Sequence, residues 1–355
     1  MPIAVPPKSL YSCKELMDGY NADRIGSILE TFTFLQYLEF EPYKKDGLPP
    51  GEGLGSIAAH DAAISRLLLD FLYQGPDAPR KVVGIMGGHS QPRSSLPYQN
   101  MATLARFLAR NDYLIVTGGG PGMMEAAHLG AYFRNVDDTV WRGVMASLKE
   151  LEPGSSRDVI PDAKTVVDDN GIRRTQYDQV GLHAWYKFAS DLLQESQQPG
   201  KSLAISTWEY GNEPVMPFAT AYACYFQNSI RESQLVRQAR AGIIYGRGGG
   251  GTLREIWQDV EENFYVGERE LLTPMIFYDH EGIWGDIGSN GTRPLDVFGT
   301  ILRVLNYAHR RHSFSWEDKV VATVDSQKIL GLLDQHVGPA HSNLMTLVAQ
   351  MRVIQ

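Results

Sequence analysis

Several features that would fix a class of protein are scarce or missing in this chain of 355 residues. It has two cysteines, Cys13 and Cys224, which are too few for a disulfide framework and are typical of a reducing cytoplasm. The first residues lack the charged and apolar regions of a signal peptide. No apolar run reaches the roughly 18 residues of a membrane-spanning helix. We therefore expect a cytoplasmic protein without a membrane partner.

The composition excludes further classes of partner. A net charge of −8 argues against a protein that binds nucleic acid polymers through their phosphates. The histidines are scattered without metal-ligand spacing, so we assign no metal. Hydrophobic residues make up 43% of the chain and charged residues 21%, as in an ordinary globular protein.

The first 78 residues predict a helical N-terminal extension. Apolar residues recur at helical spacing in Ile25–Leu38 and again in Ile57–Tyr73, on either side of a loop at Pro49–Gly55. No residue type in this part points to chemistry. The extension is therefore interpreted as a cap, an oligomerisation element or a regulatory segment.

Residues 79–355 predict an α/β domain. Lys81–Gly88 and Tyr113–Thr117 read as buried strands that flank a helix at Pro97–Arg110, and the second strand runs into the glycine turn Gly118–Gly122 before another helix. Such a βαβ unit implies a Rossmann-like parallel sheet with helices on both faces and ligand sites at its carboxyl edge.

The rest of the domain is predicted to contain an insertion, further strands and two helices. Residues 133–200 form an insertion of a length that suggests a lid over the site. Lys201–Ser206 and Pro274–Tyr278 predict further strands, and Phe218–Arg240 predicts one long helix. The domain is expected to end at Val320–Leu333 as a strand followed by a helix.

A second glycine turn, Gly248–Gly251, follows the apolar run Ala241–Tyr245 and opens a helix that ends near Tyr265. Bare glycine amides and the positive end of the helix dipole favour an anion, and a phosphate fits best. The turn lacks the lysine of a P-loop, and the first turn lacks the Gly-x-Gly-x-x-Gly spacing. Glu255 would place a carboxylate beside the phosphate.

Purely structural roles compete with this interpretation. The pattern from Thr252 to Glu255 is that of a capping box, and spacing alone favours this role for the glutamate. Arg231 is compatible with a solvated helix surface. Trp208 and Tyr210 could stack on a base, but the core is the usual place for such side chains.

Two motifs together resemble the LOG (Lonely Guy) family of phosphoribohydrolases. They are Gly118–Ala127 (Gly-Gly-Gly-Pro-Gly-Met-Met-Glu-Ala-Ala) and Arg247–Glu255 (Arg-Gly-Gly-Gly-Gly-Thr-Leu-Arg-Glu), the latter similar to the family signature Pro-Gly-Gly-x-Gly-Thr-x-x-Glu. Thr207–Pro214 and Tyr225–Glu232 look closer to the long bacterial branch, the pyrimidine/purine nucleotide 5'-monophosphate nucleosidases. The resemblance covers about residues 80–280.

The resemblance implies a Rossmann-like enzyme that hydrolyses a nucleoside 5'-monophosphate to a free base and ribose 5-phosphate, without a cofactor. It places the catalytic carboxylate at Glu255 and the catalytic arginine at Arg231. The helix N-terminus and this arginine are expected to hold the carboxylate ionised. The implied partners are the substrate and a second copy of the chain, in a homodimer or a larger homo-oligomer. The implied phosphate-binding residues are Gly248, Gly249, Gly250, Gly251 and Thr252.

The sequence departs from the short LOG enzymes at Arg247, where they have proline, and at Glu232, where they have lysine, which leaves the nucleobase open. A nucleotide-sensing module and, more weakly, a dinucleotide-dependent enzyme remain alternatives. Retention of both the arginine and the glutamate favours the enzyme. We also expect substrate contacts from the strand ends and turns and from one asparagine: Gly87, Gly88, Gly119, Gly120, Gly122, Met123, Glu125 and Asn228.

Overall fold

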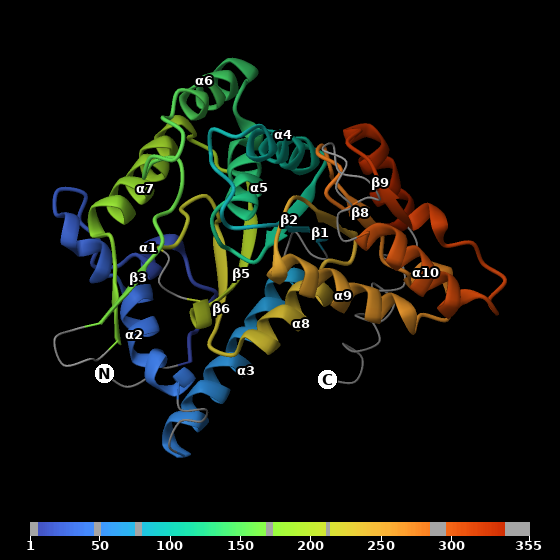
Figure 1. Ribbon diagram of the computed structural model, residues 1–355, viewed down its shortest axis with the longest axis horizontal. Coiled ribbons are helices and arrows are strands. Elements are labelled where there is room, and N and C mark those ends of the chain that lie inside the picture. The colour runs from blue at the N-terminus through green and yellow to red at the C-terminus, as the bar shows by residue number, and fades with distance from the viewer. Residues whose placement is uncertain are drawn as a thin grey trace.

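The centre of the protein is a seven-stranded sheet in which every neighbouring pair of strands is parallel (Figure 1). The computed structural model describes residues 6–45, 51–74, 80–167, 173–210, 214–284 and 296–337. The spatial order is β6-β5-β2-β1-β7-β8-β9. The strands are β1 (Lys81–Met86), β2 (Tyr113–Thr117), β5 (Ser202–Thr207), β6 (Ala221–Tyr225), β7 (Gly242–Tyr245), β8 (Met275–Phe277) and β9 (Val320–Ala322).

Helices cover both faces of this sheet, which confirms the predicted Rossmann-like class. The crossovers through α4 (Leu96–Arg110) and α5 (Met123–Tyr132) lead from β1 toward β6, whereas α8 (Asn228–Gln238) and α9 (Gly250–Phe264) lead back toward β9. Because parallel crossovers are right-handed, these two directions place the two pairs on opposite faces. In Figure 1, α4 and α5 lie above the sheet and α8 and α9 lie in front of and below it.

The apolar strands form because both of their faces are covered. All five residues of β2 are buried, as are the last five of β1, so these strands read as continuous apolar runs. Lys81 pairs with Tyr113 across β1 and β2, and Val83 pairs with Gly242 across β1 and β7. The strands predicted at 81–88, 113–117, 201–206, 241–245 and 274–278 are confirmed within a few residues.

The sheet reverses its direction of growth between β1 and β7, and this reversal opens a crevice at their carboxyl ends. The loops that follow the two strands touch through main chain. The amide of Gly88 donates to the carbonyl of Arg247 at 2.8 Å, and a Cβ atom on Gly88 would lie 3.2 Å from the Cα atom of Gly248. Glycine at this contact therefore lets the two loops approach closely.

The single long helix predicted at Phe218–Arg240 is wrong. The segment divides into β6, which pairs with β5, and α8, which begins at Asn228. All five residues of β6 are buried, so no alternation of polar and apolar residues marks the strand. Burial against the neighbouring elements overrides the helical preference of its alanines.

The N-terminal extension is helical, as predicted, and packs on the β6 edge of the sheet. Tyr11 and Tyr222 exchange main-chain hydrogen bonds of 3.0 and 2.8 Å, so an antiparallel bridge covers this edge. The indole of Trp208 donates to the hydroxyl of Thr33 at 3.0 Å. A domain boundary at residue 78 stays a prediction. The elements are α1 (Cys13–Leu16), η1 (Ile25–Leu29), α2 (Phe32–Lys45) and α3 (Gly51–Tyr73).

The insertion at 133–200 holds a two-stranded antiparallel sheet and two longer helices. The guanidinium of Arg93, in the loop before α4, anchors it by donating to the carbonyls of Arg157 and Trp185 at 2.8 and 2.9 Å. The insertion's main elements are α6 (Asp138–Lys149), β3 (Lys164–Val167), β4 (Arg173–Gln176) and α7 (Gln179–Leu192). The remaining elements are η2 (Phe133–Asn135), η3 (Leu193–Glu195), η4 (Trp208–Tyr210), η5 (Arg269–Leu271), α10 (Val297–His309), η6 (Glu317–Lys319) and a helix at 326–337.

Candidate active site

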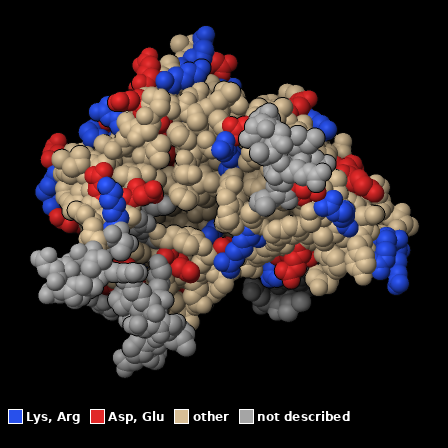
Figure 2. Space-filling view, viewed as in Figure 1, with Lys and Arg blue, Asp and Glu red and all other residues tan. Residues whose placement is uncertain are grey.

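A cavity of about 590 Å³ lies in the crevice at the carboxyl ends of the strands. It opens on the face seen in Figure 2, which is hollowed near its centre. None of the described residues of the insertion lines this cavity, so the expected lid does not form its wall. Many of the residues predicted for the site do line it: Gly87, Gly88, Gly119, Gly120, Arg231, Gly248, Gly249, Gly250, Gly251, Thr252 and Glu255.

The N-terminus of α9 is the part of the cavity best suited to an anion. Gly249 is the N-cap residue, and no side chain caps the helix. The amides of the first turn therefore lack an intrahelical acceptor, and the residues that carry them line the cavity. A Cβ atom on Gly248 would lie 2.1 Å from the hydroxyl oxygen of Thr252, so the turn needs glycine there.

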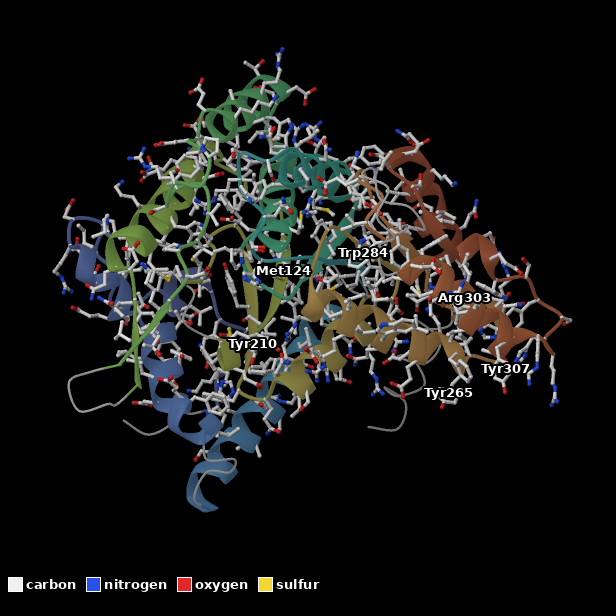
Figure 3. The ribbon with its side chains drawn as sticks, in the orientation of Figure 1. Met124, Tyr210, Tyr265, Trp284, Arg303 and Tyr307 are labelled. Carbon is white, nitrogen blue, oxygen red and sulfur yellow. The ribbon has the colours of Figure 1, made fainter. Side chains whose placement is uncertain are left out.

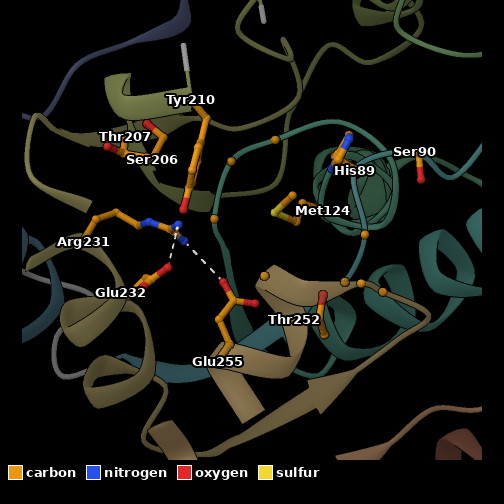
Figure 4. Close-up of a pocket in the computed structure, with 18 of the residues that line it drawn as sticks. His89, Ser90, Met124, Ser206, Thr207, Tyr210, Arg231, Glu232, Thr252 and Glu255 are labelled. Atoms are coloured by element: carbon orange, nitrogen blue, oxygen red, sulfur yellow. Dashed lines mark hydrogen bonds and ion pairs between the residues drawn. The ribbon is translucent and has the colours of Figure 1, made fainter. Parts of the chain in front are cut away.

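The capping box expected from Thr252 to Glu255 is wrong. The helix begins at Gly250, so the threonine is its third residue rather than its N-cap. The glutamate lies a further turn along the helix and directs its carboxylate toward Arg231 (Figure 4). Its side chain is thus free of the structural role that spacing alone favoured.

The first glycine turn differs from the second, because one amide within it and one directly after it are already paired. Gly122, with φ of 69°, is the N-cap of α5, and the amide of Met123 donates to the carbonyl of Gly88 at 3.0 Å. The amide of Gly119 donates to the hydroxyl of Thr117 at 2.9 Å. This turn therefore shapes the cavity wall, while α9 offers the open helix end.

Four residues predicted to contact substrate lie outside the cavity lining, namely Gly122, Met123, Glu125 and Asn228. Glu125 is fully buried, and its carboxylate accepts from Arg93 at 3.1 and 2.5 Å. Its charge at the start of α5 is thus compensated by an arginine, which makes this pair a link between α5 and the loop before α4. No pattern in the sequence indicates this partner, which lies 32 residues away.

Glu255 and Arg231 meet at the cavity from different helices (Figure 4). One guanidinium nitrogen of Arg231 lies 3.3 Å from Oε1 of Glu255. Two others donate to the side-chain oxygen of Asn228 at 2.9 and 2.7 Å. Asn228 itself does not line the cavity, and its side chain supports the arginine.

A second carboxylate, that of Glu232, lies on the other side of Arg231 (Figure 4). It is 3.6 Å from the guanidinium and also accepts from the amide nitrogen of Asn228 at 2.8 Å. The other carboxylate oxygen of Glu232 lies 2.7 Å from the guanidinium of Arg254. Charges of opposite sign thus alternate from Glu255 to Arg254 along the interface of α8 and α9.

Burial decides the charge state of Glu255. The pKa of this carboxyl is raised to about 7, chiefly because it is removed from water; the Arg231 guanidinium lowers it, and the nearby Glu232 acts in the same direction as burial. This direction is opposite to the expectation that the helix end and the arginine hold the carboxylate ionised. At neutral pH the group exchanges a proton readily, which is the property of a general acid or base.

Other lining residues escaped prediction from the sequence. Ser206 and Thr207 end β5, and His89 lies three residues after the end of β1. Their position at the carboxyl edge of a parallel sheet could have marked them. Met124, on α5, and Tyr210, at the end of η4, also line the cavity, and both are labelled near the middle of the molecule in Figure 3. Tyr210 is 55% exposed, so the expected core position is wrong for this residue, whereas Trp208 is buried in the core.

The cavity also receives a residue from the N-terminal extension, Thr33, and an exposed cation at its rim, Arg247. Arg247 forms an ion pair with Glu281 across the rim. No group of described residues has the composition of a metal site. No described helix is long and apolar enough to cross a membrane.

Comparisons with known proteins cover part of the chain. Residues 80–152 match the model of the SLOG cluster4 family. The matched segment runs from β1 to α6 and includes the first glycine turn but not the second. No curated protein matches the chain.

One solved structure that the chain matches is that of the molybdenum cofactor binding protein from the phototrophic bacterium Rippkaea orientalis. It shares 12% sequence identity, and the alignment covers 73% of this chain and 98% of that chain with a TM-score of 0.37. A likeness at this level carries no conclusion about ligand or activity.

Proposed function

We propose that the protein hydrolyses the N-glycosidic bond of a nucleoside 5'-monophosphate, releasing a free base and ribose 5-phosphate. The observation that carries this proposal is the position of Glu255, a carboxylate with a pKa near neutrality, in the same cavity as the uncapped N-terminus of α9. The resemblance of Arg247–Glu255 to the LOG signature supports the same reaction.

The 5'-phosphate binds the amides at the start of α9, which fixes the ribose against the carboxylate of the same helix. Bond cleavage passes through a sugar with cationic character, as in glycoside hydrolysis. Ionised Glu255 stabilises this charge and accepts a proton from the attacking water. The water oxygen bonds to the anomeric carbon, the base leaves with the electron pair of the broken bond, and solvent protonates the base.

Arg231 orients Glu255 in this scheme. Its guanidinium is held by Asn228 and lies between two carboxylates, so little of its charge remains to attract the phosphate. Phosphate binding then rests on the helix end and the glycine amides. The reaction needs no cofactor.

A nucleotide-sensing module is the second candidate, because such a module needs the open helix end but no acid. The buried carboxylate with a raised pKa favours the enzyme, since burial of an ionisable group costs stability that simple binding does not require.

Base release from a panel of nucleoside 5'-monophosphates, followed by chromatography, tests the proposal. Each nucleotide is paired with its nucleoside, which lacks only the phosphate. We expect release from at least one nucleotide and at least ~100-fold slower release from its nucleoside, because the phosphate positions the sugar. Tight binding of a nucleotide without release would favour the sensor.

A further inference from the structure

A carboxylate of the N-terminal extension holds the chain directly in front of α8. Asp61, on α3, is 1% exposed. Its Oδ1 accepts from the main-chain amide of Phe226 and its Oδ2 from that of Gln227, both at 3.0 Å. These two residues immediately precede Asn228, the first residue of the helix that carries Arg231.

The N-terminus of α8 depends on partners outside the helix. Its N-cap residue, Gln227, makes no capping bond with its side chain. Asp61 supplies the acceptors instead and places a negative charge at the positive end of the helix dipole. Glu209 contributes a further contact of 3.1 Å to the amide of Asn228.

Asp61 is itself fixed from the far side by a buried network. His60 Nδ1 lies 3.1 Å from Asp61 Oδ1, and His60 Nε2 lies 3.0 Å from the hydroxyl of Tyr11. Tyr11 also forms the main-chain bridge to Tyr222 at the sheet edge. A network in which each buried group is paired holds its members in one geometry.

The position of Arg231 follows from this support. Its amide donates to the carbonyl of Gln227 at 3.2 Å, one helical turn after the residue that Asp61 binds. Its side chain then reaches Glu255 on α9, so a shift of the start of α8 would change the contact between the two helices.

We infer that Asp61 is a positioning residue for the reaction, and that the N-terminal extension completes the active site by fixing α8 against α9. The inference rests on the proposed function. The two parts of the protein then have different roles. The N-terminus of α9 binds the phosphate, whereas the extension sets the geometry of Arg231 relative to Glu255.

The variant Asp61→Asn tests this role, because asparagine has nearly the same size as aspartate. It replaces one of the two accepting oxygens by an NH2 group, which cannot accept a hydrogen bond from the main-chain amide that faces it. We expect kcat to fall ~10-fold or more, as small misplacements of catalytic groups do. KM should stay within about threefold of the wild-type value, because the phosphate seat lies on α9. The matched control is Asp70→Asn, a partly exposed aspartate on the same helix.

The pH dependence of kcat provides a readout that a general loss of stability would not move. The charged groups facing Glu255 are Arg231 and Glu232 on α8 and Arg254 on α9. If Arg231 is displaced, its charge lowers the pKa of Glu255 less than in the wild type, so this pKa rises. The fall of kcat at acid pH, called the acid limb, should therefore move to higher pH in Asp61→Asn. The control should keep the wild-type limb.

A folded Asp61→Asn protein with wild-type kcat and an unchanged acid limb would overturn the inference. The same holds if activity is lost only in proportion to the unfolded fraction. Should the variant not fold, Tyr11→Phe removes only the hydroxyl that binds His60, and an unchanged limb there would overturn the inference equally. Wild-type protein that releases no base would instead contradict the proposed function.

Discussion

At the scale of single residues, the candidate site is governed by two carboxylates that share one guanidinium. Glu255 and Glu232 lie on either side of Arg231, and only Glu232 has a second arginine, Arg254, as a partner. Both carboxylates are largely buried, and the charge of Glu232 raises the pKa of Glu255.

The variant Glu232→Gln removes the negative charge that raises the pKa of Glu255. We expect this pKa to fall below about 7, and the acid limb of kcat to move to lower pH with it, because the reaction needs the ionised form. The measurement is kcat against pH between 5 and 9.

The control for this prediction is Glu262→Gln, which removes a partly exposed carboxylate of α9 that does not line the cavity. It should leave the acid limb in place. A limb that moves to higher pH in Glu232→Gln would show that the loss of its bonds to Asn228 and Arg254 outweighs the loss of its charge.

Residue patterns indicated which groups line the cavity better than they indicated the contacts of those groups. The glycine turn and its neighbouring acid could be found in the sequence, and the resemblance to a family supplied the roles of Glu255 and Arg231. The buried ion pair of Glu125 could not be predicted, because its partner, Arg93, is distant in the chain. The false capping box shows the same limit, since its pattern is local but the start of the helix is set by packing.

At the scale of elements, a buried hydrogen bond joins β7 to α9 beneath the candidate site. The hydroxyl of Tyr245 donates to the carboxylate of Asp259 at 2.7 Å. Burial raises the pKa of Asp259 to about 8, although the bond from Tyr245 acts in the opposite direction. At neutral pH the group therefore carries a proton for most of the time.

This pKa makes stability depend on pH. The folded protein keeps a proton on Asp259 that the unfolded chain releases near pH 4, so the stabilisation is complete below that pH and is lost as pH rises through about 8. Between pH 7 and 9 the free energy of unfolding should fall by about 1.4 kcal/mol on this account.

The variant Asp259→Asn keeps an acceptor for Tyr245 and cannot ionise. We expect it to unfold with a weaker dependence on pH than the wild type between pH 7 and 9, as measured by chemical denaturation. Asp191→Asn, at an exposed position on α7, serves as the control and should keep the wild-type dependence. An unchanged slope in Asp259→Asn would mean that Asp259 is already ionised at neutral pH.

Elements could be predicted where periodicity or an apolar run was long. α4 and β2 appear at the predicted residues, but β6 does not, because five buried residues without alternation look alike in a strand and in a helix. The pairing of β6 with β5 is a contact between distant parts of the chain, which a local pattern does not contain.

At the scale of the whole molecule, the N-terminal extension belongs to the same structure as the sheet. It covers the β6 edge through Tyr11, contributes Thr33 to the cavity and holds α8 through Asp61. The sequence predicted its helices but left its role open among a cap, an oligomerisation element and a regulatory segment. These contacts favour the role of a cap on the sheet edge, and they connect this cap to the candidate site.

The order of the strands explains why residues from distant parts of the chain share one cavity. Loops after β1 and β7 meet because the chain leaves β1 in one direction and returns on its other side. The general rule for such sheets predicted a site at the carboxyl edge, but not which loops would meet. Figure 2 shows positive and negative side chains interspersed on the face around the recess.

The most direct test of the account compares wild-type protein with Glu255→Gln in base release and in binding of the same nucleotide by calorimetry. Glutamine can still accept from Arg231 and is neutral, so the buried site should stay folded. We expect the affinity for the nucleotide to stay within about threefold and kcat to fall by ~100-fold or more, because only the carboxylate can accept the proton. Equal kcat in the two proteins would contradict the assignment of Glu255 as the catalytic group.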